Sequence, residues 1–238
     1  MTILPLNTIS DVVAHVVLLL KEHVRQAGRL SIAVPTGKTP LPLYKACARQ
    51  PAGTFRSVTW FALDEFYGSD IPVNMTFRSV LLTHLMQPCA LQDTKLNSLR
   101  HDTDNPQVES ARYENLMASC GGLDLALLGI GGNGHIAFNE PGIPHDSRTG
   151  IRQLSRATLT ANQYLFQGIP TPTHGLSMGI GTILEAKTVI LMATGPGKAD
   201  IIGRLNALSE PTPDLPASAL LNHPDVRIIV DADAGTQI

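Results

Sequence analysis

The sequence predicts an α/β fold in which helices cover both faces of a doubly wound, mainly parallel, Rossmann-like sheet. Short apolar runs recur along the chain without strict polar alternation, a pattern typical of strands that are buried on both faces. Segments long enough to form helices separate these runs, as in βαβ units. Gly, Asp or Thr closely follows most of the runs, so we expect a ligand crevice beyond the carboxyl ends of the strands.

The first predicted element is a helix that begins near Thr8 and ends near Gly28. Residue types that cap helices occur from Thr8 to Asp11. The apolar residues of one helical face then follow: Val12, Val13, Val16, Val17, Leu20 and Val24. The predicted strands are residues 30–34, 58–63, 123–128, 189–192 and 226–230.

We expect a single domain over residues 1–238. The chain is 43% hydrophobic and 16% charged, a balance that supports a buried core, and no Pro/Gly/Ser linker divides it. Residues 142–172 are mostly polar and begin and end near Gly and Pro. They are interpreted either as a mobile lid or as an ordinary surface helix with long connections.

Charge and cysteine content exclude several classes of protein. Eighteen basic and twenty acidic residues give a net charge of −2, which does not favour nucleic acid as a partner. No apolar run approaches the roughly 20 residues that span a bilayer. The three cysteines lie far apart in the sequence, which argues against a disulfide framework and against a structural zinc site. With no secretory pattern in the first ten residues, we expect a cytoplasmic protein.

The loop after the first predicted strand, residues 35–40, is a candidate phosphate site. Its glycine allows close approach of the backbone to a ligand, and its hydroxyl and amide groups can face phosphate oxygens. The candidate ligands are Thr36, Gly37, Lys38 and Thr39. A nucleotide-binding P-loop is excluded because Ile32 stands where that motif needs glycine. The alternative is a purely structural turn.

Two adjacent carboxylates, Asp64 and Glu65, follow the second predicted strand. An α/β crevice places a general base at such a position. We expect the two side chains to diverge, one facing the ligand and the other pairing with a neighbour such as Arg78. A solvated acidic loop or a helix cap is the alternative.

The glycine-rich loop at residues 129–141 is the most informative stretch of the chain. It matches the dinucleotide-binding fingerprint formally, but Pro141 stands where the cofactor's helix should continue. The loop presents Asn133, His135 and Glu140, an amide, an imidazole and a carboxylate suited to moving protons. The alternatives are a structural histidine, or a metal site that adds His145 and Asp146, although the spacing fits no zinc pattern.

Lys198 follows the fourth predicted strand at the start of a helix, within the sequence Gly-Pro-Gly-Lys. Its ammonium group suits a phosphate as a point charge. The alternative is a solvated surface lysine.

These motifs together resemble the glucosamine-6-phosphate deaminase family over nearly the whole chain. The resemblance is carried by residues 134–141 (GHIAFNEP), 63–66 (LDEF) and 35–40 (PTGKTP), and by later pieces such as 178–184 (MGIGTIL). The related phosphogluconolactonases share Gly-His but lack the Phe-Asn-Glu-Pro continuation. The resemblance therefore favours the deaminase.

The resemblance implies conversion of D-glucosamine 6-phosphate and water to D-fructose 6-phosphate and ammonia, without metal, nicotinamide or pyridoxal. It implies that Asp64 is the base for the C2 proton and that His135 and Glu140 serve ring opening. Asn133 stands where some members have aspartate, so we assign it an orienting role. Galactosamine 6-phosphate, the C4 epimer, stays open as the substrate, as do a lactonase and an inactive sugar-phosphate sensor.

The chain also departs from the family pattern at the phosphate. Tyr164 stands where the family often has a phosphate-binding arginine, so Arg148, foremost, or Arg152 or Arg156 is expected to compensate. The chain resembles the shorter bacterial branch and lacks the C-terminal extension of allosterically regulated members. We therefore expect no allostery, and either a monomer or a homo-oligomer.

Overall fold

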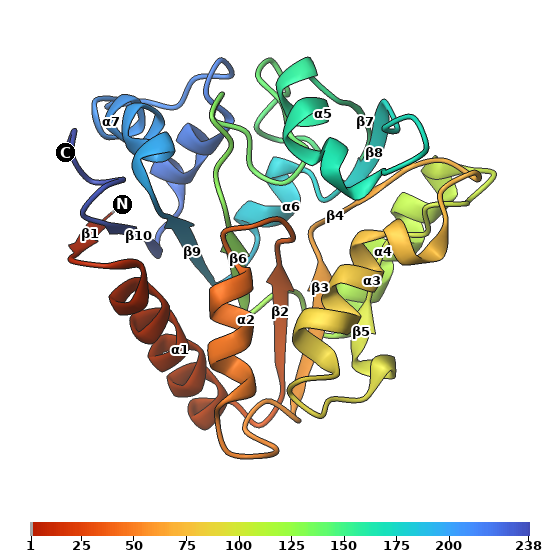
Figure 1. The fold of residues 1–238 in the computed structure, drawn as a ribbon, viewed down its shortest axis with the longest axis horizontal. Helices are drawn as coiled ribbons and strands as arrows, with labels where there is room; N and C mark the ends of the chain where they lie inside the picture. Colours follow the sequence, from red (N-terminus) through yellow and green to blue (C-terminus); the bar gives the residue numbers. More distant parts are fainter. Residues whose placement is uncertain (1) are drawn as a thin grey trace.

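The five predicted apolar runs, together with Thr2–Leu6 and Leu96–Asn97, which were not predicted as strands, form a seven-stranded parallel sheet in the computed structural model, which describes residues 2–238 (Figure 1). The strand order is β1-β10-β9-β6-β2-β3-β5, and every neighbouring pair is parallel. The strands are β1 (Thr2–Leu6), β2 (Leu30–Val34), β3 (Val58–Ala62), β5 (Leu96–Asn97), β6 (Leu125–Leu128), β9 (Thr188–Ala193) and β10 (Val226–Asp231). The predicted fold class is confirmed.

The strand order reverses between β2 and β6. From β2 the chain runs outward through β3 to β5, then returns to β6 and runs outward the other way through β9 and β10. Loops that leave two such strands diverge and leave a crevice between them, where α/β proteins bind ligands. The loops at residues 35–40 and 129–141 flank this point.

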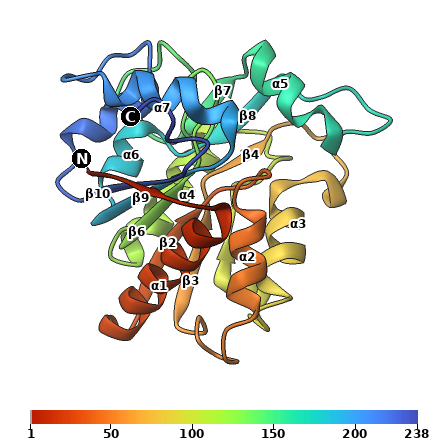
Figure 2. The ribbon, with the colours of Figure 1, turned by 60° about the vertical axis from the view of Figure 1, so that its left-hand side comes forward.

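Two apolar layers cover the sheet. Helices α1 (Ile9–Gln26) and α2 (Leu41–Ala48) pack on one face with Ile32, Trp60 and Ile190. On the other face lie α4 (Pro106–Ser119), α6 (Ile180–Leu184) and α7 (Ala199–Asn206). Figure 2 shows α1 and α2 side by side on one face, with α4 behind the sheet. The sheet is therefore doubly wound.

Helix α1 begins where the sequence predicts. The Thr8 hydroxyl accepts a hydrogen bond from the Asp11 amide, and the Asp11 carboxylate accepts one from the Thr8 amide, so the two residues form a capping box. No helix within residues 2–238 combines the length and the apolar character that a bilayer-crossing helix requires.

A second sheet of three short strands was not predicted from the sequence. Strands β4 (Asp64–Phe66), β8 (His174–Ser177) and β7 (Gly150–Gln153) pair antiparallel and lie above the carboxyl ends of the parallel strands (Figure 1). Strands of three or four residues that contain Gly, Asp and Arg carry little periodic signal. Residues 142–172 contain β7 and α5 (Arg156–Asn162). Whether they move as a lid stays a prediction.

An aromatic cluster joins the parts of the chain that surround the crevice. The Phe66 ring lies 5.1 Å from Phe138 and 4.7 Å from Phe166 between centroids, in both cases edge to face. Phe66 follows the paired carboxylates, Phe138 lies between His135 and Glu140, and Phe166 follows α5. All three are buried. The cluster therefore holds three site-bearing segments in one packed unit.

Candidate active site

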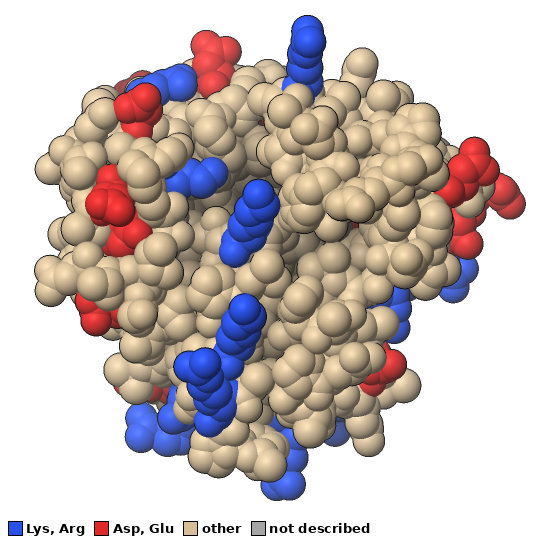
Figure 3. Space-filling view, viewed as in Figure 1, with Lys and Arg blue, Asp and Glu red and all other residues tan. Residues whose placement is uncertain are grey.

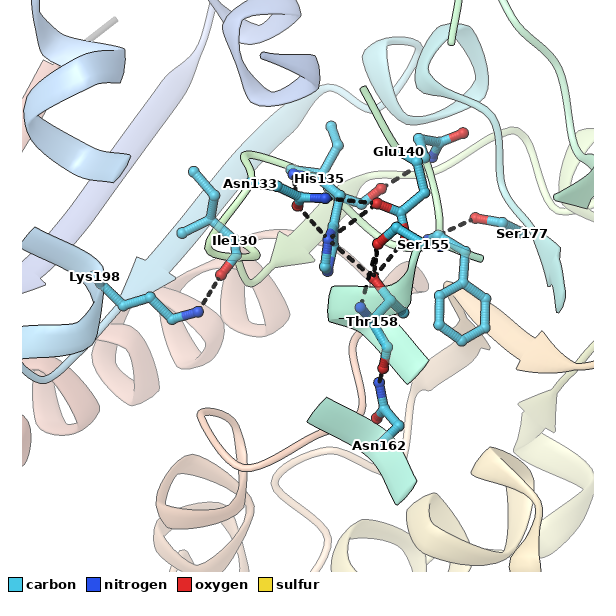
Figure 4. Close-up of polar contacts among 12 residues, drawn as sticks. Ile130, Asn133, His135, Glu140, Ser155, Thr158, Asn162, Ser177 and Lys198 are labelled. Carbon is cyan, nitrogen blue, oxygen red and sulfur yellow. Dashed lines mark hydrogen bonds and ion pairs between the residues drawn. The ribbon is translucent and has the colours of Figure 1, made fainter. Parts of the chain in front are cut away.

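The candidate site lies at the carboxyl end of the parallel sheet, where the loops after β2, β3, β6 and β9 meet. Figure 3 shows a hollow on this face, between the part that carries α7 and the part that carries α5, with basic side chains at its edge. Figure 4 shows the polar contacts around His135.

The loop after β6 is tightly folded, and its turns bring His135 and Glu140 together. The Gly131 amide donates to the His135 carbonyl at 2.9 Å, and Ala137 adopts a φ of 49°, which is unusual for a residue with a Cβ. Ile136 and Phe138 anchor the loop because both side chains are buried. As a result His135 Nδ1 lies 3.7 Å from Glu140 Oε2.

Asn133 bridges these two side chains. Its Nδ2 donates to Glu140 Oε2 at 2.7 Å, and its Oδ1 lies 2.7 Å from His135 Nδ1. An ionised carboxylate only accepts hydrogen bonds, so the amide nitrogen must face Glu140 and the amide oxygen must face the imidazole. His135 therefore carries its proton on Nδ1, which donates to Asn133. Nε2 is left as the basic nitrogen.

The electrostatics keep Glu140 ionised and His135 neutral. Burial alone would raise the pKa of Glu140, but hydrogen bonds from Thr158, Asn133 and the Ser155 amide outweigh it and lower that pKa. Burial lowers the pKa of His135, and the charge of Lys198 lowers it further, against the opposing effect of Glu140. The result is a neutral imidazole coupled through an amide to a carboxylate.

Asp64 and Glu65 diverge, as expected from the sequence. Glu65 is 1% exposed, and its carboxylate accepts hydrogen bonds from the amides of Phe66, Phe77 and Arg78. The predicted pairing with Arg78 is therefore made by its backbone, while its guanidinium donates to the Leu96 carbonyl and the Ser98 hydroxyl.

The Asp64 side chain is 6% exposed, at the first position of β4. Burial first, and then the neighbouring charge of Glu65, raise the pKa of Asp64 to about 8. A carboxyl group with such a pKa can both take and return a proton near neutral pH.

The two candidate phosphate lysines lie in different surroundings. Lys198, in the turn before α7, is half-buried and donates to the Ile130 carbonyl at 2.6 Å, so it contacts the loop that carries His135 (Figure 4). Burial lowers its pKa. Lys38 is exposed, and its Nζ lies 5.0 Å from the centroid of the Tyr164 ring, a cation–π contact. Gly37 between Thr36 and Lys38 has a φ of 93°, which glycine tolerates.

The Arg148 guanidinium forms ion pairs with Glu114 and Glu185. Arg152 donates to the Asn139 side chain and to the Arg148 carbonyl. That Arg148 replaces the missing phosphate-binding arginine stays a prediction. At Tyr164, where the family often has that arginine, the ring faces Lys38.

Ser155 and Thr158 also contact the site, although neither was predicted from the sequence as a site residue. Both donate to Glu140 Oε1, Ser155 from its amide at 3.1 Å and Thr158 from its hydroxyl at 2.5 Å. Ser155 is the N-cap of α5, a role that its residue type suggests. No spacing rule links this helix start to a carboxylate 15 residues earlier, so only the fold reveals the contact. Within residues 2–238, no three His, Cys, Asp or Glu side chains are grouped as metal ligands.

Comparison with known proteins places these observations in one family. A family model described as glucosamine-6-phosphate isomerases/6-phosphogluconolactonase matches residues 6–229. A glucosamine-6-phosphate deaminase of Streptococcus pneumoniae is 40% identical over 218 residues, which cover 91% of each chain. A glucosamine-6-phosphate deaminase 2 of Giardia intestinalis is 36% identical over 224 residues, covering 92% of this chain and 85% of the relative. A solved structure of a monomeric glucosamine-6-phosphate deaminase is 30% identical, with a TM-score of 0.93 and full coverage of both chains.

The matches extend over the elements that build the crevice, from before α1 to β10. They confirm the resemblance inferred from the loops at residues 35–40, 63–66 and 134–141. The chain belongs to the family of glucosamine-6-phosphate isomerases and 6-phosphogluconolactonases.

Proposed function

We propose that this protein is a glucosamine-6-phosphate deaminase, which converts D-glucosamine 6-phosphate and water to D-fructose 6-phosphate and ammonia. The observation that carries the proposal is the separation of two proton-handling centres on adjoining loops. One is Asp64, and the other is His135 with Asn133 and Glu140. Opening a sugar ring and moving a proton from C2 to C1 are two distinct proton transfers, and each needs its own group.

His135 and its partners open the ring. The unprotonated Nε2 takes the proton of the anomeric hydroxyl and delivers it to the ring oxygen, so the C1–O5 bond breaks and C1 becomes an aldehyde. The imidazolium that forms transiently is stabilised by Glu140 through Asn133, because a carboxylate favours a nearby cation.

Asp64 then performs the isomerisation. Its carboxylate takes the C2 proton while a proton of the substrate's ammonium group passes to O1, so that a neutral enolamine forms. The Asp64 carboxyl group then returns a proton to C1, which leaves an iminium at C2. Water adds to this carbon to give a carbinolamine, and the C–N bond breaks with release of ammonia. A raised pKa suits Asp64 to the second half of this step, because its protonated form persists near neutral pH. The sequence of steps requires no metal, nicotinamide or pyridoxal.

The phosphate is bound by the loop after β2 and by Lys198. The amides and hydroxyls of Thr36, Gly37 and Thr39 supply neutral donors, and the two lysines supply charge. Lys38 carries the charge that the arginine often supplies elsewhere in the family, and its ammonium is held over the Tyr164 ring by a cation–π contact.

Replacing Lys198 with Ala is expected to lower kcat/KM for the sugar phosphate roughly 10- to 100-fold, through both a higher KM and a lower kcat, because phosphate binding also positions the reacting carbons. Steady-state kinetics check this. Lys187→Ala is the matched control, since the Lys187 side chain is 72% exposed and pairs with Asp124. Equal kinetic constants for the two variants would show that Lys198 does not bind the phosphate.

A substitution in the glycine loop tests the placement of His135. A Cβ on Gly131 would lie 2.2 Å from His135 Cε1, so Gly131→Ala must displace the imidazole. We expect kcat to fall roughly 10- to 100-fold, as for loss of orienting groups. At Gly132 a Cβ meets nothing within 4 Å, so Gly132→Ala is expected to keep near-parental kcat. Unchanged kcat in Gly131→Ala would mean that the imidazole position is not critical.

Ammonia release tests the proposed function and its substrate. The protein is incubated separately with glucosamine 6-phosphate and with its C4 epimer, galactosamine 6-phosphate, and ammonia is measured enzymatically. The proposal predicts a higher kcat/KM with glucosamine 6-phosphate. A preference for the epimer would reassign the substrate within the same chemistry, and no ammonia from either would refute the deaminase.

A further inference from the structure

Glu140 is held from two sides, by groups from different parts of the chain. Asn133, in its own loop, donates to Oε2, whereas Thr158 and the Ser155 amide, at the start of α5, both donate to Oε1 (Figure 4). The carboxylate therefore has its orientation fixed by three donors. Two of these donors lie at the start of α5, which contributes no other group to the proposed proton relay.

The Thr158 side chain uses its one hydrogen-bond donor for the contact with Glu140. The residue is 1% exposed, and its hydroxyl has a single proton, which goes to Glu140 at 2.5 Å. The hydroxyl oxygen lies 3.4 Å from His135 Nδ1 and accepts a hydrogen bond from the Ser155 hydroxyl at 3.2 Å. Thr158 thus touches both titratable members of the set while donating to only one of them.

The hydroxyl is not needed to start α5. The Ser155 side chain caps the helix by accepting from the Thr158 amide at 3.2 Å, so the cap uses the backbone of Thr158 and leaves its side chain free. A side chain that served only packing at this site could be Val, which has the same shape. The buried hydroxyl is accounted for by its bond to Glu140.

We propose that Thr158 is a positioning residue for ring opening: its hydroxyl holds the Glu140 carboxylate in the orientation and charge state that keep Asn133 and His135 aligned. The proposal rests on the proposed function. The chain of contacts runs from Thr158 to Glu140, from Glu140 to Asn133, and from Asn133 to His135 Nδ1. Loss of the first bond weakens the preference of Glu140 for the ionised form and frees its side chain to rotate.

The contact also links α5 to the chemistry. The first turn of α5 is anchored by its hydrogen bonds to Glu140. The chain that follows α5 is anchored by Phe166 in the aromatic cluster. Any displacement of α5 from the loop after β6 removes both donors from Oε1 at once. The position of α5 and the proton affinity of Glu140 are therefore coupled.

The test compares Thr158→Val, which removes the hydroxyl and keeps the shape, with Thr158→Ser, which keeps the hydroxyl. With glucosamine 6-phosphate, Thr158→Val is expected to lower kcat roughly 10- to 100-fold, as for groups that orient a reacting residue, with KM changed less than about threefold. Thr158→Ser is expected to retain kcat within about threefold. Thermal melting shows that each variant is folded, and Thr158→Ala replaces Thr158→Val if the latter does not fold.

A second readout does not depend on turnover. The ring nitrogen resonances of His135 are followed by NMR as a function of pH in the ligand-free proteins, because protonation of Glu140 perturbs the neighbouring imidazole. The transition that reports Glu140 is expected at higher pH in Thr158→Val than in the parent, and unchanged in Thr158→Ser. Parental kcat and titration in Thr158→Val, or equal loss in both variants, would overturn the proposal.

Failure of the proposed function has a different signature. A parent protein that releases no ammonia from glucosamine 6-phosphate refutes the deaminase, and the NMR comparison still decides whether Thr158 controls Glu140.

Discussion

Asp64→Asn is expected to lower kcat for ammonia release roughly 10³- to 10⁴-fold, the upper range for loss of a general base, while binding of the phosphate ester stays within about threefold. The amide has nearly the shape of the carboxyl group but cannot take the C2 proton. The proposed phosphate ligands lie on other loops, after β2 and β9, so we expect their positions not to depend on Asp64.

Exchange of the C2 proton with solvent measures this step directly. The parent should incorporate deuterium from D2O at C2 of the unreacted substrate, and Asp64→Asn should not. Deuterium incorporation at the parental rate in Asp64→Asn would remove Asp64 from its proposed role.

The raised pKa of Asp64 adds a pH dependence. Its folded-state pKa of about 8 lies above its unfolded value, so the native state binds more protons between the two and stability falls as pH rises through this range. An asparagine side chain does not ionise, so it does not lower the stability in this pH range. Asp64→Asn should therefore melt at a higher temperature than the parent at pH 8, and the difference should shrink towards pH 4. A lower melting temperature at pH 8 would show that burial of Asp64 is compensated by another group.

His135→Gln is expected to slow the forward reaction roughly 10²- to 10⁴-fold, because the closed pyranose can no longer exchange protons with Nε2. The rate of the reverse reaction should fall much less. Fructose 6-phosphate and ammonia form the open-chain amino sugar first, and ring closure can follow without the enzyme. Solvent deuterium should therefore still appear at C1 of the ketose phosphate.

The direction of the defect is the diagnostic measurement. Initial rates of ammonia release and of C1 labelling are compared for His135→Gln and for Glu140→Gln, which should show the same asymmetry with a milder loss of roughly 10- to 100-fold. If His135→Gln abolished C1 labelling as completely as Asp64→Asn, His135 would belong to the isomerisation itself.

Five of the seven strands of the parallel sheet could be read from the sequence because they are buried on both faces. The largely exposed β1 and the two-residue β5 were not predicted. The run at residues 30–34 coincides with β2, and the other four runs differ from their strands by no more than a few residues. The loops at 35–40 and 129–141 could be anticipated for the same reason, since they leave these strands at the carboxyl edge. Helix α1 was signalled by its capping residues and its apolar face.

The parts that depend on tertiary pairing could not be read in this way. Strand β4 coincides with the carboxylate pair and pairs with β8, over a hundred residues later in the chain. The contact of Thr158 with Glu140 likewise depends on how α5 folds back over the crevice. Arg148 was a candidate phosphate ligand by its charge, and its ion pairs with Glu114 and Glu185 likewise depend on tertiary structure.

The family contains both isomerases and lactonases, so a paired assay with one substrate of each kind distinguishes the deaminase from a lactonase. The protein, dialysed against EDTA, is supplied in parallel with glucosamine 6-phosphate and with 6-phosphoglucono-δ-lactone. We expect equimolar ammonia and fructose 6-phosphate from the first substrate, with no hydrolysis of the second above the uncatalysed rate. Hydrolysis of the lactone without release of ammonia from the amino sugar would contradict the proposed function.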